Sequence, residues 1–301
     1  MSLFATRLRL AASPDAIKDL SFACTRRSLH RGSSNFPVSS RAHGRAFSAS
    51  GGSDTTSSKT DTAPLDMASG PVNGFQMNQY VIACTATRQA AIVDCGASSR
   101  QELNAFLKWM TERDYQLTAV WQTHAHLDHI AGLGLLSTTS TDDDTDVSSS
   151  DVPIYLHPNE REIYKSFPQR CQDFGFTVEG GTDTLPSHDD LTYFTPDQTT
   201  MTLGNLTFDI IPTPGHSPGQ VGFLLSASSS SEPPIFLGGD FIMQGSIGRT
   251  DFPTSSPQDM DASLKRFVEI MDEKTVIYPG HGPPTTLERE KQANPFLQPF
   301  L

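Results

Sequence analysis

The sequence predicts a mixed α/β (α+β) fold, because short β-prone runs alternate irregularly with amphipathic helical patterns from residue 71 to residue 301. Histidines and aspartates recur where the expected strands end, and loops at strand ends often carry functional side chains. The sequence contains no glycine-rich phosphate loop and no internal repeat. A chain of 301 residues with 36% hydrophobic residues suits one domain of roughly 200 residues with polar tails.

The N-terminal segment differs in charge from the rest of the chain. Residues 1–50 contain seven Arg and one Lys against two acidic residues, whereas the remainder contains 14 basic and 32 acidic residues, a net charge of −18. An Arg- and Ser-rich, acid-poor start predicts an organelle transit peptide over residues 1–47. Arg45 shortly before Phe47, with Ser48 next, resembles a mitochondrial processing site. We expect the mitochondrial matrix as the location; a plastid and a merely disordered extension are the alternatives.

Two further polar stretches interrupt the chain. Residues 48–70 are rich in Ser, Thr, Asp and Gly and are predicted to form a disordered linker, which leaves residues 71–301 as the folded domain. Residues 138–151 form a second Ser/Thr-rich stretch with three consecutive aspartates. We expect this stretch to be a low-complexity insertion without a chemical role.

The expected strands are short runs rich in β-branched, aromatic and other apolar residues. They cover residues 79–84, 90–93, 117–122, 153–157, 206–211, 221–225, 235–237 and 276–278. The first two runs are separated by five residues and predict a hairpin, and so do the runs at 221–225 and 235–237, which enclose a Ser-rich tip.

Helices are expected where apolar residues recur at helical spacing. They cover residues 103–110, 130–136 and 260–271, together with a final helix that ends before Pro295. The final helix has the capping-box pattern of Thr285 followed by Glu288.

Composition also limits the class of protein. No segment reaches the roughly 18 apolar residues of a membrane span, and a domain with a net charge of −18 offers no basic track for nucleic acid. Neither a membrane nor a nucleic acid is therefore expected as a partner. The four cysteines have no paired spacing, so neither disulfides nor a thiolate zinc site is predicted. Cys95, which follows Asp94, is expected to be buried and inert.

Side chains that bind metals follow four of the expected strands. The first strand is followed by the sequence THAHLDH over residues 123–129. The candidate ligands are His124, His126, Asp128, His129, His216, Asp240 and His281. Imidazole nitrogens and carboxylate oxygens suit zinc, iron or manganese, and ligands at alternate positions of one loop can face two neighbouring ions. The sequence therefore predicts a two-metal site, whereas His157, which ends a strand, is expected to be structural.

From about Phe75 onward the chain resembles the small, single-domain glyoxalase II-type (hydroxyacylglutathione hydrolase-like) enzymes of the metallo-β-lactamase superfamily. The resemblance rests on THAHLDH at 123–129, PGHSPG at 214–219, GGD at 238–240, GRTDFP at 248–253, PGHGP at 279–283 and NPFL at 294–297. It implies an αββα four-layer sandwich over residues 71–301, with the metals at one edge between two sheets.

The resemblance also implies a division of the ligands. His124, His126 and His216 would hold the first metal, Asp128, His129 and His281 the second, and Asp240 would bridge the two ions. Zinc is the metal expected first, with iron or manganese as alternatives. Two ions that share a water lower its pKa, so a metal-bound hydroxide, with Asp128 as the catalytic carboxylate that holds the geometry, would attack a thioester carbonyl.

The expected function is that of a hydrolase cleaving S-2-hydroxyacylglutathione or a related small-molecule thioester. Related two-domain enzymes hold glutathione with a further helical domain, whereas this chain extends only 20 residues beyond His281. Arg249 is the cation nearest the site in sequence, and it is either an anchor for a substrate carboxylate or a structural bridge to Asp251. The acyl group and the oligomeric state are not assigned.

Three alternatives stay open at this stage. A persulfide dioxygenase with one iron shares the histidine motif and the GRTDF segment, although PGHGP and NPFL favour the hydrolase branch. Lactonase or β-lactamase activity is compatible with the same fold, because fold does not fix substrate. The chain could also be a non-catalytic metal-binding protein.

Overall fold

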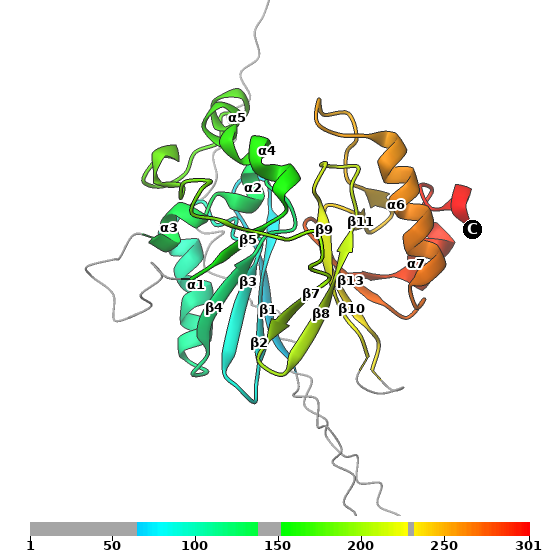
Figure 1. Cartoon of the computed structure of the whole chain (residues 1–301), viewed down its shortest axis with the longest axis horizontal. Coiled ribbons are helices and arrows are strands. Elements are labelled where there is room, and N and C mark those ends of the chain that lie inside the picture. Colours follow the sequence, from blue (N-terminus) through cyan, green and yellow to red (C-terminus); the bar gives the residue numbers. More distant parts are fainter. Residues whose placement is uncertain (1–64, 138–151, 228–231) are drawn as a thin grey trace, which may run out of the picture.

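The structure is a computed structural model that describes residues 65–137, 152–227 and 232–301. The predicted transit peptide, the predicted insertion over 138–151 and the first 17 residues of the predicted linker lie outside these ranges. Two six-stranded sheets face each other, and helices cover the outer face of each sheet (Figure 1). The fold is therefore the αββα sandwich that the resemblance implies.

The first sheet contains β1 to β6 in chain order. Its strands are β1 (Leu65–Val72), β2 (Met77–Cys84), β3 (Gln89–Val93), β4 (Gln116–Trp121), β5 (Ile154–Leu156) and β6 (Thr192–Tyr193). β1, β2 and β3 are antiparallel, which confirms the predicted hairpin, and β3 to β6 run parallel. Parallel strands deliver their carboxyl ends to one edge of the sheet.

The predicted linker over residues 48–70 is wrong at its C-terminal end, because β1 begins at Leu65. β1 pairs with β2 along its whole length, from Leu65 opposite Cys84 to Val72 opposite Met77. Met67 and Ala68 are buried in this pairing. The run LDMASGPV has little intrinsic strand preference, so the pairing and the burial determine its conformation.

The second sheet has the order β14-β13-β10-β9-β8-β7. Its strands are β7 (Thr200–Leu203), β8 (Leu206–Pro212), β9 (Val221–Leu225), β10 (Ile235–Gly239), β13 (Val276–Pro279) and β14 (Thr285–Thr286). β9 and β10 are antiparallel, as the predicted hairpin requires, and part of the tip between them lies outside the described ranges. A small ribbon, β11 (Ile242–Met243) with β12 (Ser246–Ile247), follows β10.

Seven α-helices and several 3₁₀ turns are present in the described part of the chain. The α-helices are α1 (Arg100–Thr111), α2 (Leu127–Ile130), α3 (Leu133–Ser137), α4 (Arg161–Lys165), α5 (Phe167–Phe174), α6 (Pro257–Ile270) and α7 (Leu287–Ala293). The 3₁₀ turns are η3 (Pro158–Glu160), η4 (Thr182–Thr184) and η5 (Gln298–Phe300). None of the helices in the ranges just given is long and apolar enough to cross a membrane.

Two of the expected helices differ in detail. The helix expected over residues 130–136 is divided into α2 and α3 at Gly132, whose N–H donates to the Cys95 carbonyl at 2.8 Å. A side chain at Gly132 would lie 2.9 Å from Cys95 Sγ, so the close approach requires glycine. The cap of α7 is Thr286, not Thr285, and its hydroxyl accepts the Arg289 N–H.

The apolar core lies in three layers. Between the sheets, the Trp121 ring from β4 packs edge-on against Phe208 from β8, with ring centroids 5.3 Å apart. On the outer face of the first sheet, α1 buries Leu103 and Phe106. On the outer face of the second sheet, α6 buries Phe267 against Phe236 of β10 at 4.7 Å. The central layer fixes the two sheets against each other, so loops from both meet at one edge.

Candidate metal centre

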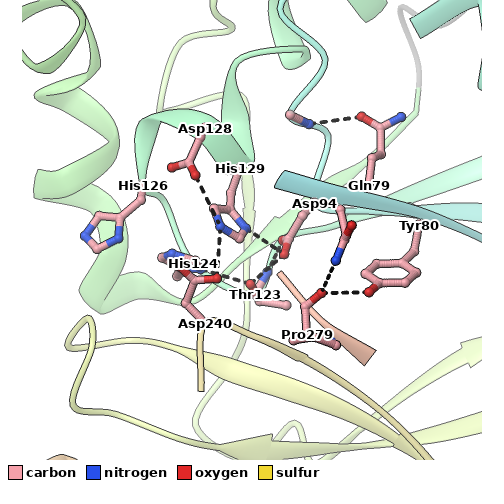
Figure 2. Close-up of polar contacts among 12 residues, drawn as sticks. Gln79, Tyr80, Asp94, Thr123, His124, His126, Asp128, His129, Asp240 and Pro279 are labelled. Carbon is pink, nitrogen blue, oxygen red and sulfur yellow. Dashed lines mark hydrogen bonds and ion pairs between the residues drawn. The ribbon is translucent and has the colours of Figure 1, made fainter. Parts of the chain in front are cut away.

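All seven candidate ligands lie together at this edge, and they come from four loops. His124 follows β4, His126 is the N-terminal cap residue of α2, and Asp128 and His129 lie in α2. His216 follows β8, Asp240 follows β10 and His281 follows β13. Figure 2 shows the contacts of the His129 ring with Asp94, Asp128 and Asp240.

His124, His126 and His216 form what we call the three-histidine group. One nitrogen of each ring lies within 4.8 Å of one nitrogen of the others, and His126 Nδ1 is 2.8 Å from His216 Nε2. All three residues are buried. Burial lowers the pKa of each ring, that of His124 well below its usual value and that of His126 to about 3. The group therefore presents neutral nitrogens with free lone pairs, the form in which histidine binds metals.

Asp128, His129 and His281 form the second cluster, which we call the carboxylate group. Their ligand atoms also lie within 4.8 Å of one another, and His281 Nε2 is 3.1 Å from Asp128 Oδ2. Burial acts to lower the pKa of His129, but the carboxylates of Asp240, Asp128 and Asp94 outweigh it and hold that pKa well above its usual value. Positive charge is therefore favoured at this point.

Asp240 lies between the two groups. Its Oδ2 is 3.5 Å from His216 Nε2 and 3.6 Å from His281 Nε2, and its Oδ1 is 3.4 Å from His129 Nε2. Burial acts to raise the pKa of this carboxyl, yet the surrounding histidines hold it well below its usual range. Gly280 leaves room for the Asp240 carboxylate, because a Cβ atom at residue 280 would lie 2.2 Å from Asp240 Oδ1. Asp240 is thus placed to contact cations in both groups.

Asp94 directly precedes Cys95 in the sequence, and its side chain orients His129. Asp94 follows β3 with φ of 57°, in the left-handed region, and is buried. Its Oδ1 accepts the Thr123 N–H at 2.7 Å, and its Oδ2 accepts the Thr123 hydroxyl at 2.8 Å and lies 2.9 Å from His129 Nδ1 (Figure 2). A proton on Nδ1 is thereby fixed, which leaves Nε2 directed at the centre.

The sequence places Asp94 directly after the expected strand over residues 90–93, but the contacts that give it a role come from the parallel neighbouring strand and its loop. Cys95 itself is buried, and burial raises the pKa of its thiol. The expectation that Cys95 is buried is therefore confirmed, and the raised pKa disfavours the reactive thiolate. Asp94 is grouped by distance with His124 and His129, but both of its oxygens already have partners, so we assign it to orientation.

Glu160 joins two ligand loops and had no role in the sequence analysis. The residue is fully buried at the end of η3. Its Oε2 accepts the Ala125 N–H at 2.9 Å, between His124 and His126, and its Oε1 accepts the Gly219 N–H at 2.6 Å, in the loop of His216. Burial raises the pKa of Glu160, while these N–H donors act to lower it. One side chain therefore fixes the spacing within the three-histidine group.

The remaining two ligand loops are also anchored. His216 Nδ1 lies 2.8 Å from the Arg249 carbonyl oxygen, an arrangement that directs Nε2 at Asp240. The Tyr80 hydroxyl of β2 donates to the Pro279 carbonyl at 2.7 Å, and this contact crosses from the first sheet to the loop of His281 (Figure 2). His157 accepts the Asn159 N–H at the start of η3, as expected for a structural residue.

The Arg249 side chain forms the bridge to Asp251 that the sequence analysis considered. Nε donates to Oδ1 at 2.9 Å and Nη2 to Oδ2 at 2.8 Å, and both side chains are exposed. The guanidinium lies over the Phe252 ring at 4.6 Å. Phe252 in turn packs edge-on against His126, with ring centroids 5.3 Å apart.

The arrangement of four strand-end loops around two His/Asp clusters has a counterpart among known families. Residues 72–281 match the Metallo-beta-lactamase superfamily. The chain belongs to this superfamily. A protein of the superfamily need not share the substrate of any other, since the fold supports several chemistries.

Three relatives of this superfamily chain show how close the similarity is. The hydroxyacylglutathione hydrolase GloC of Haemophilus influenzae is 29% identical over 231 residues, which cover 75% of this chain and 95% of GloC. The crystal structure of the BLEG-1 B3 metallo-beta-lactamase has a TM-score of 0.58 at 28% identity, covering 77% of this chain and 99% of that one. The structure of TTHA1623 in a di-iron-bound form has the same TM-score and identity, covering 75% and 99%.

The residues present fit two divalent cations. Three buried atoms of the two groups and of Asp240 have no hydrogen-bond partner within the described residues: His124 Nε2, His129 Nε2 and Asp240 Oδ1. An unsatisfied buried polar atom costs about 1–3 kcal/mol, and cations would satisfy such nitrogens and oxygens together. The two clusters are consistent with a dinuclear site, and with the family they indicate a metal-dependent hydrolase.

Proposed function

We propose that the protein is a thioesterase that hydrolyses S-2-hydroxyacylglutathione with two divalent metal ions. One observation carries the proposal: Asp240 contacts His216 of the three-histidine group and both His129 and His281 of the carboxylate group. A carboxylate shared in this way suits a bridge between two ions. The three-histidine group would hold one ion, the carboxylate group the other, and Asp240 both.

Bound at these positions, a pair of divalent ions supplies Lewis acidity for the scissile carbonyl and an activated water as nucleophile. The chain's own residues prepare the site for this chemistry. Asp94 and the Arg249 carbonyl hold His129 and His216 with Nε2 directed inward. The Asp128 carboxylate bonds to His281, the most exposed of the ligand histidines at 27%. This side of the centre is therefore where substrate and water approach, and Asp128 is the carboxylate that we place beside the reacting water.

The substrate class is supported by the similarity to GloC, which is named as a hydroxyacylglutathione hydrolase. The metal is supported by the donor set, in which nitrogen and carboxylate oxygen suit zinc, iron and manganese. We propose zinc, and the di-iron form of TTHA1623 makes iron the first alternative to test.

Elemental analysis and turnover of one sample test the proposal. We expect two metal ions per chain and stoichiometric release of glutathione thiol from S-lactoylglutathione. One iron per chain with oxygen uptake on glutathione persulfide would replace the proposal with a dioxygenase. A sample with two metals that turned over no thioester and no lactone would show a non-catalytic metal-binding protein.

We also propose that residues 1–47 direct the protein to the mitochondrial matrix. The proposal rests on their Arg-rich, acid-poor composition. A fluorescent fusion of the full chain should reach mitochondria and lose that location when residues 1–47 are removed, and N-terminal sequencing of the mature protein should begin near Ser48. Accumulation in plastids, or an unchanged distribution after the deletion, would contradict this location.

A further inference from the structure

An arginine on α5 lies beside the candidate metal centre and is held by aromatic rings. The Arg170 guanidinium carbon is 5.6 Å from the centroid of the Phe174 ring and 5.6 Å from that of Phe252. Phe252 packs on His126 at 5.3 Å and on His216 at 5.8 Å. A single ring therefore separates the Arg170 guanidinium from the three-histidine group.

Arg170 differs from the other arginines that lie on aromatic rings. Arg249, on the same Phe252 ring, is bonded to Asp251 through two nitrogens. Arg113 and Arg161, which lie on Trp109 and Tyr193, have carboxylates within 4.0 Å. Across residues 65–137, 152–227 and 232–301, no carboxylate or carbonyl oxygen bonds to the Arg170 guanidinium, so its N–H donors are available to a ligand.

An exposed aromatic surface adjoins Arg170. The Phe75 ring stacks on Phe176 at 5.4 Å and meets the edge of Phe174 at 6.4 Å. Phe75 and Phe174 are 43% and 47% exposed, which is unusual for phenylalanine. Together these three rings and Phe252 form a surface on which an organic molecule can lie with its reactive end at the metal centre and its other end near Arg170.

We propose that Arg170, between Phe174 and Phe252, binds a carboxylate of the thioester substrate. A guanidinium is suited to a carboxylate because its two N–H donors match the two oxygens. The surrounding domain is strongly acidic, with 32 acidic against 14 basic residues after residue 50, so an anionic substrate requires a local cation. The inference rests on the proposed function in that it names the anionic end of the substrate of the same site.

Two thioesters of the same acyl group test the proposal. S-lactoylglutathione carries two carboxylates, and the lactoyl thioester of N-acetylcysteamine carries none. In Arg170→Met we expect KM for S-lactoylglutathione to rise about 10- to 100-fold, as for the loss of a charge-assisted hydrogen bond, with kcat within about twofold. The kcat/KM for the neutral thioester and the metal content should not change.

Arg88→Met is the matched control. The Arg88 guanidinium lies on the Tyr115 ring at the same 5.6 Å, and Arg88 precedes β3 whereas Asp94 follows it, so it lies at the opposite end of that strand from the metal centre. The control removes the same charge and a ring contact of the same length, together with the hydrogen bond from Arg88 Nη1 to the Arg113 carbonyl, and it should leave both KM values unchanged.

Binding without turnover separates this inference from the proposed function. Calorimetry of the metal-loaded protein with S-methylglutathione should show binding that weakens by the same factor in Arg170→Met, whereas the diethyl ester of S-methylglutathione should bind both proteins equally. If the wild type bound S-methylglutathione through Arg170 but cleaved no thioester, only the proposed function would fail.

Three results would overturn the inference. The first is an equal effect of Arg170→Met on the charged and the neutral thioester. The second is a KM increase in Arg249→Met with none in Arg170→Met, which would make Arg249 the anchor. The third result concerns Arg170→Lys, which serves if Arg170→Met does not fold. This variant keeps the charge but loses the paired N–H donors of the guanidinium. An unchanged KM for S-lactoylglutathione and an unchanged affinity for S-methylglutathione in Arg170→Lys would overturn the inference.

Discussion

The two ligand groups differ in charge, although they lie side by side at one edge of the sandwich. The three-histidine group is buried and has lowered pKa values, so its nitrogens are neutral. The carboxylate group is partly exposed, and its histidines have raised pKa values because Asp128 and Asp240 face them. The first group would bind a cation through nitrogen lone pairs, whereas the negative charges of the second would attract a cation electrostatically. The same fold thus provides two positions with different reasons to bind a metal.

The largest effect should come from the residue that both groups share. In Asp240→Asn the loss of a shared negative charge should lower the metal content at both positions and reduce thioesterase activity by about a thousandfold or more, as for other groups that stabilise charge in the transition state. Metal analysis and kcat/KM are the measurements. Asp261→Asn, on the exposed face of α6, is the control and should retain activity. Activity within tenfold of wild type in Asp240→Asn would remove the bridging role.

Removing one histidine from each group should separate the two positions. His126→Ala should lose the ion of the three-histidine group and nearly all activity, because water has little access to this buried group and cannot readily replace the lost imidazole as a ligand. His281→Ala should keep that ion and lose the other, with a smaller decrease of about a hundredfold in kcat/KM. Metal content of each variant after dialysis checks the assignment. Equal loss of both ions in both variants would show that the groups act as one unit.

Asp94→Asn should affect the carboxylate group more than the three-histidine group, because Asp94 contacts His129 directly and reaches His124 only through the Thr123 hydroxyl. The substitution keeps the size of the side chain but weakens the interaction with His129 Nδ1, and changes of this kind reduce metal affinity about 10- to 100-fold. Competition with a chelator should therefore release the ion of the carboxylate group more readily than the ion of the three-histidine group. A variant that released the ion of the three-histidine group first would contradict the orientation of His129 by Asp94.

Glu160→Gln should affect the three-histidine group in the same selective way. The amide can accept only one of the two N–H donors, from Ala125 or Gly219, so one buried donor loses its partner at a cost of about 1–3 kcal/mol. We expect a lower midpoint of thermal unfolding and a lower affinity of the three-histidine group for its ion. Glu162→Gln, an exposed neighbour, is the control. An unfolding midpoint equal to wild type would show that the two loops do not depend on Glu160.

The smallest effect is a pH dependence of opposite sign in the two groups of the metal-free protein. His126 has a folded pKa of about 3 against about 6.5 unfolded, so its contribution to stability is present above about pH 6.5 and is lost as pH falls toward 3. His281 has a raised pKa, so its contribution is present below about pH 6.5 and is lost as pH rises. His126→Ala should therefore reduce acid destabilisation, and His281→Ala should reduce alkaline destabilisation, by a few degrees each in thermal unfolding.

The sequence predicted those parts of the molecule that depend on local pattern. The two hairpins follow from the strand pattern, and the seven strand-end side chains from their places after the expected strands, whereas the αββα sandwich was implied by the family resemblance. β1 was assigned to a linker because its strand conformation depends on pairing with β2. The sequence prediction placed the capping residue of α7 at Thr285 instead of Thr286, because the pattern does not distinguish two adjacent threonines.

Asp94 and Glu160 were missed for a different physical reason. Each acts by accepting backbone or side-chain protons from loops distant in sequence, and such contacts leave no periodic signal. Glu160 lies 35 residues from Ala125 and 59 from Gly219. Arg170 has a similar explanation, since its proximity to Phe252 depends on how α5 packs beside the second half of the chain. Positions of this kind require the tertiary structure.

The origin of the ligands has a consequence for how the molecule holds together. His124, His126, Asp128 and His129 come from the half that contains the first sheet, whereas His216, Asp240 and His281 come from the other half. Each ligand group combines residues of both halves, so neither half contains a complete group. A bound ion would therefore link the two halves, in addition to the apolar layer between the sheets. Hydrogen exchange at this edge should slow on metal loading, and a chain cleaved between residues 194 and 200 should separate into its two halves at a lower denaturant concentration without the ions than with them.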